Sequence, residues 1–448
     1  METCLYLIIG YTSWAFAGHV PALLFPVVGL AVIMLIMLLR DRGRRAELLR
    51  DPVFYLAAVF LTLLLLQWIN AGLYSSADPD GRVWLGRDIP TCIPFSVVGW
   101  KAWEMIAWFL PAFAIILTVR HADINPSRLI RVVLINGAAL AVVGIIQELC
   151  KAHAMFWFIP FSKRFFATFQ YENSAGDYFF LLFCLAMSRR QLVLAALFAW
   201  AVWLAGCNAT TIMLLIPGLI LVSLPMLIKI KSKKLVIIFC CLAGALGGAT
   251  GLWLSDKTIS YALADRWWQI IVNFKVWQQF PIFGTGGWGC RYFPSLVATM
   301  DQQALLAAAP NNHCDPVQFL AEFGLIGTAC LAGTLVILIR TAWRNHASIA
   351  IAIGLTLVFI HSTFDCPFRS PAVLFLWITM LTISTPPAPL TQKKMKNRSL
   401  PPILNTIPAP KMVRPRTEEK RSNHCDLCKN PPESDQTDYS VGFRVKSS

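Results

Sequence analysis

The chain has 448 residues, of which 56% are hydrophobic and 14% are charged, and its mean hydropathy is +0.59. Soluble domains contain about 45–50% apolar and about 25% charged residues, so this composition excludes an ordinary soluble protein and indicates a membrane protein. A formal net charge of +15 would also suit a nucleic-acid-binding protein. Such a protein gathers its basic residues on one folded face. Here they are distributed along the whole chain, so we expect no nucleic-acid partner.

Apolar runs follow one another from the first residues to about residue 385. Most are near the length of about 20 residues with which an α-helix crosses about 30 Å of hydrocarbon. They lie near residues 4–18, 20–39, 52–70, 102–119, 132–149, 175–188, 191–206, 209–228, 235–254, 316–339, 347–362 and 371–385. The pattern predicts an all-α polytopic membrane protein with about twelve transmembrane helices. The first two runs could instead be one segment with a kink at Gly18, His19 and Pro21.

Lysine and arginine residues alternate between dense and sparse connections. The connections 40–50, 120–131, 189–190, 229–234 and 340–346, with the tail after residue 385, hold 28 of the 39, and the other connections hold 11. Because cytoplasmic loops retain Lys and Arg, this alternation predicts that both termini are cytoplasmic. No basic cluster precedes the first apolar run, so we expect no cleaved signal peptide.

The same pattern divides the chain into two parts. We predict a polytopic membrane domain over residues 1–385 and a cytoplasmic tail over residues 386–448. The tail is basic and rich in proline, so we expect it to be disordered and to lie next to the membrane.

The longest external connection, near residues 255–315, is too long to be a simple turn. Within it apolar residues recur at helical spacing, at Trp267, Ile270, Ile271, Phe274 and Trp277. We therefore predict an amphipathic helix at the outer membrane surface, where tryptophan is favoured. Four glycines follow, at Gly284, Gly286, Gly287 and Gly289. They allow the backbone to approach a ligand closely, with a plain turn as the simpler alternative.

The stretch NNHCDPVQFLAEFGLIG, residues 311–327, runs from a polar cluster into an apolar run. Asp315 followed by Pro316 predicts a helix start, so His313 lies just outside the helix. Glu322 would then lie about two turns, or roughly 10 Å, deeper on the same face. An ionisable residue inside a membrane helix is a functional candidate.

Structural alternatives remain open for both residues. Gly324 and Gly327 would let a neighbouring helix come close enough to bond to Glu322. His313 could be a solvated loop imidazole instead of a catalytic group. The sequence by itself does not decide between these roles.

Cysteine and metal-binding patterns are uninformative. The chain has 13 cysteines, and a disulfide between Cys290 and Cys314 on the oxidising side is an open alternative. Cys425 and Cys428 form at most half of a zinc site. The chain contains no HExxH motif, and we predict no metal and no cofactor.

One motif resembles a known family. The spacing H-x8-E-x-G-x2-G, carried by His313, Glu322, Gly324 and Gly327, is similar to the signature of the O-antigen ligase and polymerase superfamily, in which a histidine ends a large periplasmic loop. The resemblance covers roughly residues 160–385. Its further elements are ADRWWQ with Arg266, the turn PIFGTGGWG, RFFATFQYENSAGDYF with Arg164, Thr168, Phe169, Asn173 and Ala175, and HSTFDCPF with His361 and Asp365.

The resemblance implies a helical membrane enzyme of the GT-C-like kind in the bacterial inner membrane. It would move a glycan from an undecaprenyl diphosphate carrier to an acceptor hydroxyl at the external face, as in the synthesis of lipopolysaccharide or other envelope polysaccharides. His313 would activate the hydroxyl, and Arg266 would bind the diphosphate. The supporting residues would be Glu322, Asn173, Gly286 and Gly324.

The chain departs from the family pattern at one helix end. Many members carry a Ser-Arg pair where this sequence reads GCNA at residues 206–209. A phosphate-binding arginine is therefore missing from that position. Arg164 or Arg291 could supply the lost charge.

Several alternatives share the same sequence features. An O-antigen ligase, a polysaccharide polymerase and a protein O-oligosaccharyltransferase would differ only in acceptor, which is a lipid A core, a glycan or a protein hydroxyl. A flippase or transporter of lipid-linked glycan would also have about twelve helices, with Glu148 or Glu322 as its coupling group.

Overall fold

A computed structural model describes residues 1–72, 75–77, 83–85, 92–161, 164–214, 258–293, 297, 313–344 and 348–384. The chain divides into two units, Met1–Asn397 and Arg398–Ser448, and all the described residues lie in the first. The predicted span 235–254, most of the span 209–228 and the tail 386–448 lie outside the described residues.

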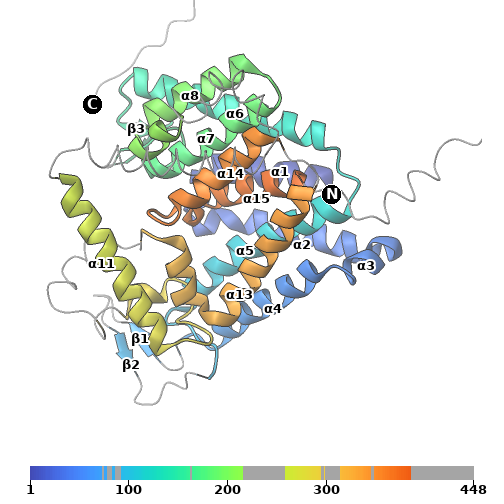
Figure 1. The fold of residues 1–448 in the computed structure, drawn as a ribbon, viewed down its shortest axis with the longest axis vertical. Helices are drawn as coiled ribbons and strands as arrows, with labels where there is room; N and C mark the ends of the chain where they lie inside the picture. The colour runs from blue at the N-terminus through green and yellow to red at the C-terminus, as the bar shows by residue number, and fades with distance from the viewer. Residues whose placement is uncertain are drawn as a thin grey trace, which may run out of the picture. The chain divides into compact units, whose positions relative to one another are not determined.

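The described part of the chain is predominantly helical, as predicted (Figure 1). Its α-helices are α1 Glu2–Trp14, α2 Phe25–Arg40, α3 Arg42–Leu48, α4 Pro52–Ile69, α5 Gly99–His121, α6 Pro126–Leu149, α7 Glu172–Ser188, α8 Leu192–Ala205, α11 Thr258–Gln279, α13 Asp315–Arg344, α14 Ile349–His361 and α15 Pro371–Ile383. The short 3-10 helices are η1 Phe16–Gly18, η2 Pro21–Leu24, η3 Gly289–Arg291 and η5 Pro367–Arg369. Two small antiparallel pairs join β1 Ser75–Ala77 to β2 Val83–Leu85 and β3 Ala154–Met155 to β4 Ile159–Pro160.

Among the described residues, 5 helical segments are long and apolar enough to cross a membrane, namely Pro21–Arg40, Pro52–Ile69, Gly99–His121, Pro126–Leu149 and Asp315–Arg344. Shorter apolar helices are α8, α14 and α15. These segments agree with an all-α membrane protein.

The first two apolar runs are separate helices. Ala17 has a φ of 53° and Gly18 a φ of 81°, so the helical path is interrupted between α1 and α2. The Met1 amino group lies 4.0 Å from the Met37 sulfur, which places the start of α1 beside the end of α2. The two helices therefore form an antiparallel hairpin, and the alternative of one kinked segment is wrong.

Two groups of connections lie at opposite ends of α5. At its C-terminal end, Arg44 Nη2 is 3.3 Å from Asp123 Oδ2. At its N-terminal end, Gly286 packs against Ser96, shortly before α5 begins. Because α5 has 23 residues, its ends are about 34 Å apart. The glycine-rich turn is thus far from these predicted cytoplasmic connections.

The helix α13 is not continuous, contrary to the prediction of one span over residues 316–339. Gly324 has φ 63° and ψ −167°, which is a conformation outside the helical region. The backbone N–H groups of Leu325 and Ile326 donate to Pro281 and Ile282, over 2.8 Å and 3.2 Å. Figure 1 shows the two pieces of α13 at an angle to each other. Glu322 therefore ends a short helix and does not lie inside a continuous one.

The glycines of the preceding turn explain this break. A Cβ on Gly284 would lie 2.4 Å from the backbone of Glu322, and a Cβ on Gly324 would lie 2.3 Å from the Ile282 carbonyl. Gly286 N–H donates to the Glu322 carbonyl over 2.9 Å. The glycines thus allow two backbones to approach each other, and their predicted approach to a ligand is replaced by packing within the protein.

Buried helices support the segment between α14 and α15. All residues from Ser174 to Ala186 in α7 and from Pro371 to Thr382 in α15 are buried. A helix that is apolar on all sides packs in the interior, so the turn that precedes α15 is held by the most buried part of the described fold.

The helix α11 confirms the helix that was predicted within residues 255–315. Its buried side chains include Gln269, Val272, Asn273 and Val276, and it packs against α13 (Figure 1). Trp267, Trp268 and Phe274 are exposed on the remaining surface. Part of the expected apolar stripe therefore faces away from the protein, where a membrane interface would favour indole groups.

Candidate functional site

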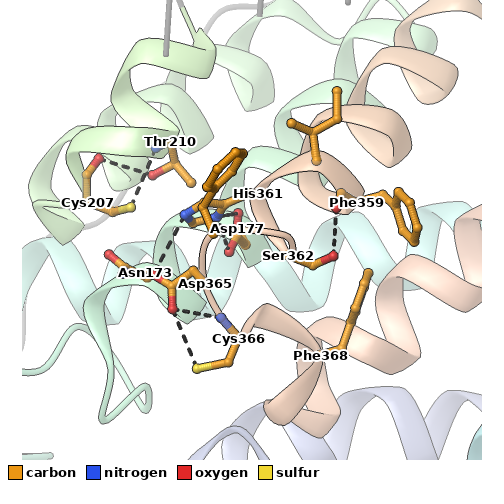
Figure 2. A network of polar contacts seen from close by, with 12 residues as sticks. Asn173, Asp177, Cys207, Thr210, Phe359, His361, Ser362, Asp365, Cys366 and Phe368 are labelled. Carbon is orange, nitrogen blue, oxygen red and sulfur yellow. Dashed lines mark hydrogen bonds and ion pairs between the residues drawn. The ribbon is translucent and has the colours of Figure 1, made fainter. Parts of the chain in front are cut away.

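A buried carboxylate, Asp365, is the centre of a polar cluster in the turn between α14 and α15 (Figure 2). Its Oδ1 lies 3.2 Å from His313 Nδ1. The Tyr171 hydroxyl donates to Oδ1 and Oδ2 over 3.0 Å and 3.1 Å, and the Asn173 amide donates to Oδ2. The backbone N–H of Cys366 donates to Oδ1 over 2.7 Å. These donors fix the carboxylate in one orientation.

Arg266 approaches the same carboxylate from α11. Its Nη2 lies 3.9 Å from Asp365 Oδ2, and its Nη1 donates to the Phe364 carbonyl over 3.0 Å. The side chain is 34% exposed, so the guanidinium has further donors that an external ligand can reach. The structure therefore brings together His313 and Arg266, which the sequence singled out as the principal candidates.

His313 is held by two elements. Its backbone N–H donates to Gln269 Oε1 on α11 over 3.2 Å, and its Nδ1 faces Asp365. The side chain is 22% exposed. Within the described residues its Nε2 has no hydrogen-bond partner. His313 is thus partly buried and anchored through its backbone and through Nδ1.

A second histidine lies behind Asp365. His361 Nδ1 is 3.0 Å from both carboxylate oxygens of Asp177 on α7, and His361 Nε2 is 3.8 Å from Asp365 Oδ2. Figure 2 shows the His361 ring between the two carboxylates. All three side chains are buried.

The surroundings set the charge of the central groups. Burial by itself would raise the pKa of Asp365, but the hydrogen bond to His313 and the positive charges of His361 and Arg266 lower this pKa below its ordinary range. Burial, with the Asp365 charge, raises the pKa of Tyr171 and of Cys366. Asp365 is therefore an anion at neutral pH, and Tyr171 is a neutral donor.

Three of these groups also have the spacing of a metal site. His313, Asp365 and Cys366 offer ligand atoms within 4.8 Å of one another. However, Asp365 already accepts hydrogen bonds from protein donors and lies beside the positive charge of Arg266. The thiol of Cys366 is held neutral by burial, whereas a metal ligand is a thiolate. The arrangement therefore fits a hydrogen-bonded carboxylate better than a bound cation.

Arg164 lies at the end of α8, beside Gly206. Its Nη2 donates to the Leu204 carbonyl over 3.1 Å at the end of α8. A Cβ on Gly206 would lie 2.4 Å from Arg164 Nη1, so the glycine makes room for the guanidinium. Glu148 and Glu172 lie 3.9 Å and 4.0 Å away. The side chain remains 52% exposed and accessible to an anion.

Arg291 belongs neither to the Asp365 cluster nor to the group of residues around Arg164. It is exposed in η3, and among the described residues it has no ion pair with a carboxylate of the Asp365 cluster. The adjacent Cys290 points inward, with its Sγ 3.3 Å from Glu322 Oε1. The predicted diphosphate-binding role of Arg291 thus receives no geometric support within the described residues.

Glu322 belongs to a separate buried charge cluster. Its Oε2 lies 2.8 Å from Arg369 Nη2, and its Oε1 accepts a hydrogen bond of 2.8 Å from Gln318. Arg369 Nε is 3.7 Å from Asp315 Oδ1. Glu322 is therefore paired inside the protein, as the structural alternative predicted, although its partner comes from η5 and not from a neighbouring membrane helix.

The two clusters share a backbone frame. Asp315 N–H donates to the Ser362 carbonyl, and Phe368 N–H donates to Asp315 Oδ2, each over 2.9 Å. These bonds fasten the segment that carries His313 to the turn that carries Asp365. The Glu322 cluster can therefore position the catalytic candidates without touching a substrate.

The other residues that the sequence singled out have different surroundings. Asn173 contacts Asp365 directly, whereas Gly286 and Gly324 act on the backbone of α13. Cys290 and Cys314 are both buried free thiols, so the disulfide between them does not form.

Sequence reasoning missed Asp177, Tyr171 and Arg369, whereas Asp365 and His361 were marked by the motif resemblance without an assigned role. A signal for one of them was present, because Asp177 is an ionisable residue inside an apolar run and such residues are functional candidates. The pairing of His361 with two carboxylates depends on tertiary contacts and leaves no local pattern. No protein-family model and no curated protein matches the sequence, so the function is inferred from the residues and their geometry.

Proposed function

We propose that the protein is a glycosyltransferase of the O-antigen ligase kind. It transfers a glycan from undecaprenyl diphosphate to an acceptor hydroxyl at the external face of the bacterial inner membrane, without a metal or cofactor. The observation that carries the proposal is the convergence of His313 and Arg266 on the buried Asp365. The motif resemblance around the same residues supports it.

In this mechanism His313 activates the acceptor. Asp365 holds Nδ1, which leaves Nε2 as the ring nitrogen that meets the acceptor hydroxyl. An imidazole takes a proton readily near neutral pH. The anionic Asp365 stabilises the imidazolium that forms, as the aspartate of a catalytic triad does. The acceptor oxygen then attacks the anomeric carbon while the bond from that carbon to the diphosphate oxygen breaks.

Arg266 stabilises the leaving group. Negative charge grows on the diphosphate as its bond to the sugar breaks, and a guanidinium offers paired donors to such oxygens. Arg266 is fixed at one end by the Phe364 carbonyl and exposed at the other. Arg164, at the end of α8, is a second cation for the same diphosphate.

An apolar cavity supports a lipid-linked donor. It has a volume of about 210 Å³ and lies between α5, α13, α14 and α15. Its lining includes Phe113, Phe319, Trp377 and Leu381, together with Asp315 and Ser362. Asp315 is two residues from His313 in the chain. A prenyl chain in this cavity would bring its diphosphate toward the polar cluster.

Transport of the lipid-linked glycan is the second candidate. The buried pair of Asp177 and His361 favours it, because ionisable residues inside membrane segments also occur in coupled transporters. Glu322, by contrast, is already paired with Arg369, which disfavours it as a coupling group.

Purified protein in liposomes tests the proposal. Labelled undecaprenyl diphosphate glycan is supplied with a lipid A core, a free glycan or an unfolded protein as the acceptor. The acceptor that gains label identifies a ligase, a polymerase or a protein O-oligosaccharyltransferase. If no acceptor gains label while the glycolipid changes leaflet, the protein is a flippase and the transferase proposal fails.

A further inference from the structure

Two buried residues extend the polar cluster inward, away from any substrate. The His361 ring lies between Asp177, at 3.0 Å from Nδ1, and Asp365, at 3.8 Å from Nε2 (Figure 2). The exposed fractions of the Asp177, His361 and Asp365 side chains are 0%, 5% and 1%. Neither Asp177 nor His361 can therefore touch an acceptor or a diphosphate.

We propose that Asp177 and His361 are positioning residues that form a buried relay with Asp365 and His313. In this relay a positively charged His361 keeps Asp365 ionised and fixes the orientation of its carboxylate. This inference rests on the proposed function. It adds a second histidine and a second aspartate that act on His313 only through Asp365.

The number of N–H donors on an imidazole gives the first reason for a charged His361. A neutral imidazole has one N–H, so it can donate to only one of two flanking carboxylates, whereas an imidazolium donates from both nitrogens. His361 faces a carboxylate on each side. The geometry is thus matched to the charged form.

Charge balance gives the second reason. Two carboxylates buried in this region require two positive charges, because an uncompensated buried charge is strongly destabilising. Arg266 supplies one, at 3.9 Å from Asp365. A charged His361 supplies the other and leaves His313 free to be neutral. The resting cluster then has no net charge, and His313 can accept the proton of a hydroxyl.

The other groups around the cluster do not change this balance. The charged and titratable groups that face it are Arg266 from α11, Asp177 from α7, Tyr171 before α7, Cys207 after α8, Asp315 at the start of α13, and His313, His361, Asp365 and Cys366. Asp315 belongs to the Glu322 cluster, where it shares Arg369 with Glu322 and lies 3.7 Å from Arg369 Nε. Cys207 and Tyr171 are neutral because burial raises the pKa of each.

The first experiment measures the transfer rate of the purified full-length protein as a function of pH. His361→Gln removes a positive charge and makes the cluster more negative, which favours proton uptake by the remaining groups. The acidic limb of the rate profile should move to higher pH by about one unit, and the maximal rate should fall about 10-fold. A purely structural role would lower the rate equally at every pH, and that result would overturn the proposal.

A matched control separates charge effects from stability effects. His121 is another buried histidine beside a carboxylate, and its Nε2 lies 2.8 Å from Asp51 Oδ2. It is the C-terminal residue of α5, whereas the glycine-rich turn packs near the N-terminal end of that helix. His121→Gln should leave the position of the acidic limb unchanged. A shift equal to that of His361→Gln would show that any buried histidine has this effect and would contradict the relay.

A second measurement does not depend on activity or on a folded variant. In 15N-histidine-labelled wild-type protein, the ring nitrogens of His361 should show the chemical shifts of an imidazolium at pH 7. The signal is assigned by its loss in His361→Gln or, if that variant does not fold, by its contact with Asp177 in the wild type. A neutral tautomer would overturn the relay, while an absence of transfer by the wild type would contradict only the proposed function.

Discussion

At the scale of single residues, His313 and Arg266 both face the carboxylate of Asp365. Asp365 contacts side chains from two distant parts of the chain, residues 171–173 and His313, so a change at either of them alters the orientation of the other. Because these contacts connect residues far apart in sequence, the effects of substitutions within the cluster should not be additive.

Arg266→Lys tests whether the charge or the planar fork of the side chain matters. Lysine keeps the positive charge but cannot make two parallel hydrogen bonds to a diphosphate. We expect a loss of at least about 10-fold in kcat/KM, the effect of about 1.4 kcal/mol of lost transition-state binding. Lys275→Arg, an exposed position on the same helix, is the control and should be neutral. Equal activity of Arg266→Lys and the wild type would identify Arg266 as a solvated loop charge.

The pKa of Asp365 links stability to pH. Since this pKa is lowered in the folded protein, the carboxylate contributes stability that is present above the unfolded pKa of about 3.9 and is lost as the pH falls below it. Thermal unfolding in detergent should show this loss in the wild type but not in Asp365→Asn. The control Asp123→Asn, at an exposed aspartate, should keep the wild-type pH dependence. A parallel pH dependence for Asp365→Asn would contradict the assignment.

At the scale of elements, hydropathy and spacing predicted most of the described helices. The run at 52–70 corresponds to α4, Pro52–Ile69, and the external amphipathic pattern corresponds to α11, Thr258–Gln279. The break in α13 was not predictable from hydropathy, because Gly324 lies inside the predicted apolar run 316–339. It arises from hydrogen bonds to Pro281 and Ile282, which are distant in sequence.

The candidate site was predictable in part. His313 and Arg266 carry local motifs and therefore could be found from the sequence. Asp365 was indicated only by the motif resemblance. Its position as the carboxylate that both His313 and Arg266 face depends on the packing of α11, α13 and the turn before α15. The charge of Glu322 was visible, but its partner Arg369 lies 47 residues further along the chain.

Substitutions in the Glu322 cluster test its structural role. Arg369→Met leaves both Glu322 and Asp315 without their cation and should destabilise the fold by about 3–5 kcal/mol. Glu322→Gln should cost less, because Arg369 retains Asp315. Adding Glu322→Gln to Arg369→Met removes a buried unpaired charge, so the double variant should be more stable than Arg369→Met. Strictly additive losses in denaturant unfolding would contradict the pairing.

At the scale of the whole molecule, the site and the basic connections lie at different ends of the described helices. Arg44 and Asp123 meet near the end of α5, whereas the glycine-rich turn packs near its start. A transferase of the proposed kind needs its site on the external side, and the distribution of Lys and Arg favours that orientation.

Reporter fusions test this orientation. Fusions within residues 41–49 should report the cytoplasm, and fusions within residues 270–300 should report the external side, because basic connections are retained inside. Western blots establish that each fusion is produced at a similar level. A cytoplasmic signal from the 270–300 fusions would exclude the proposed reaction at the external face.

The most direct measurement of the central claim is the single-turnover transfer of labelled glycan by His313→Ala. If Nε2 of His313 accepts the hydroxyl proton, the variant should bind undecaprenyl diphosphate glycan as the wild type does and transfer it at least about 100-fold more slowly. His153→Ala, which changes an exposed histidine in the connection between α6 and α7, should transfer at the wild-type rate. Transfer by His313→Ala at the wild-type rate would contradict the catalytic role of the cluster formed by His313, Asp365 and Arg266.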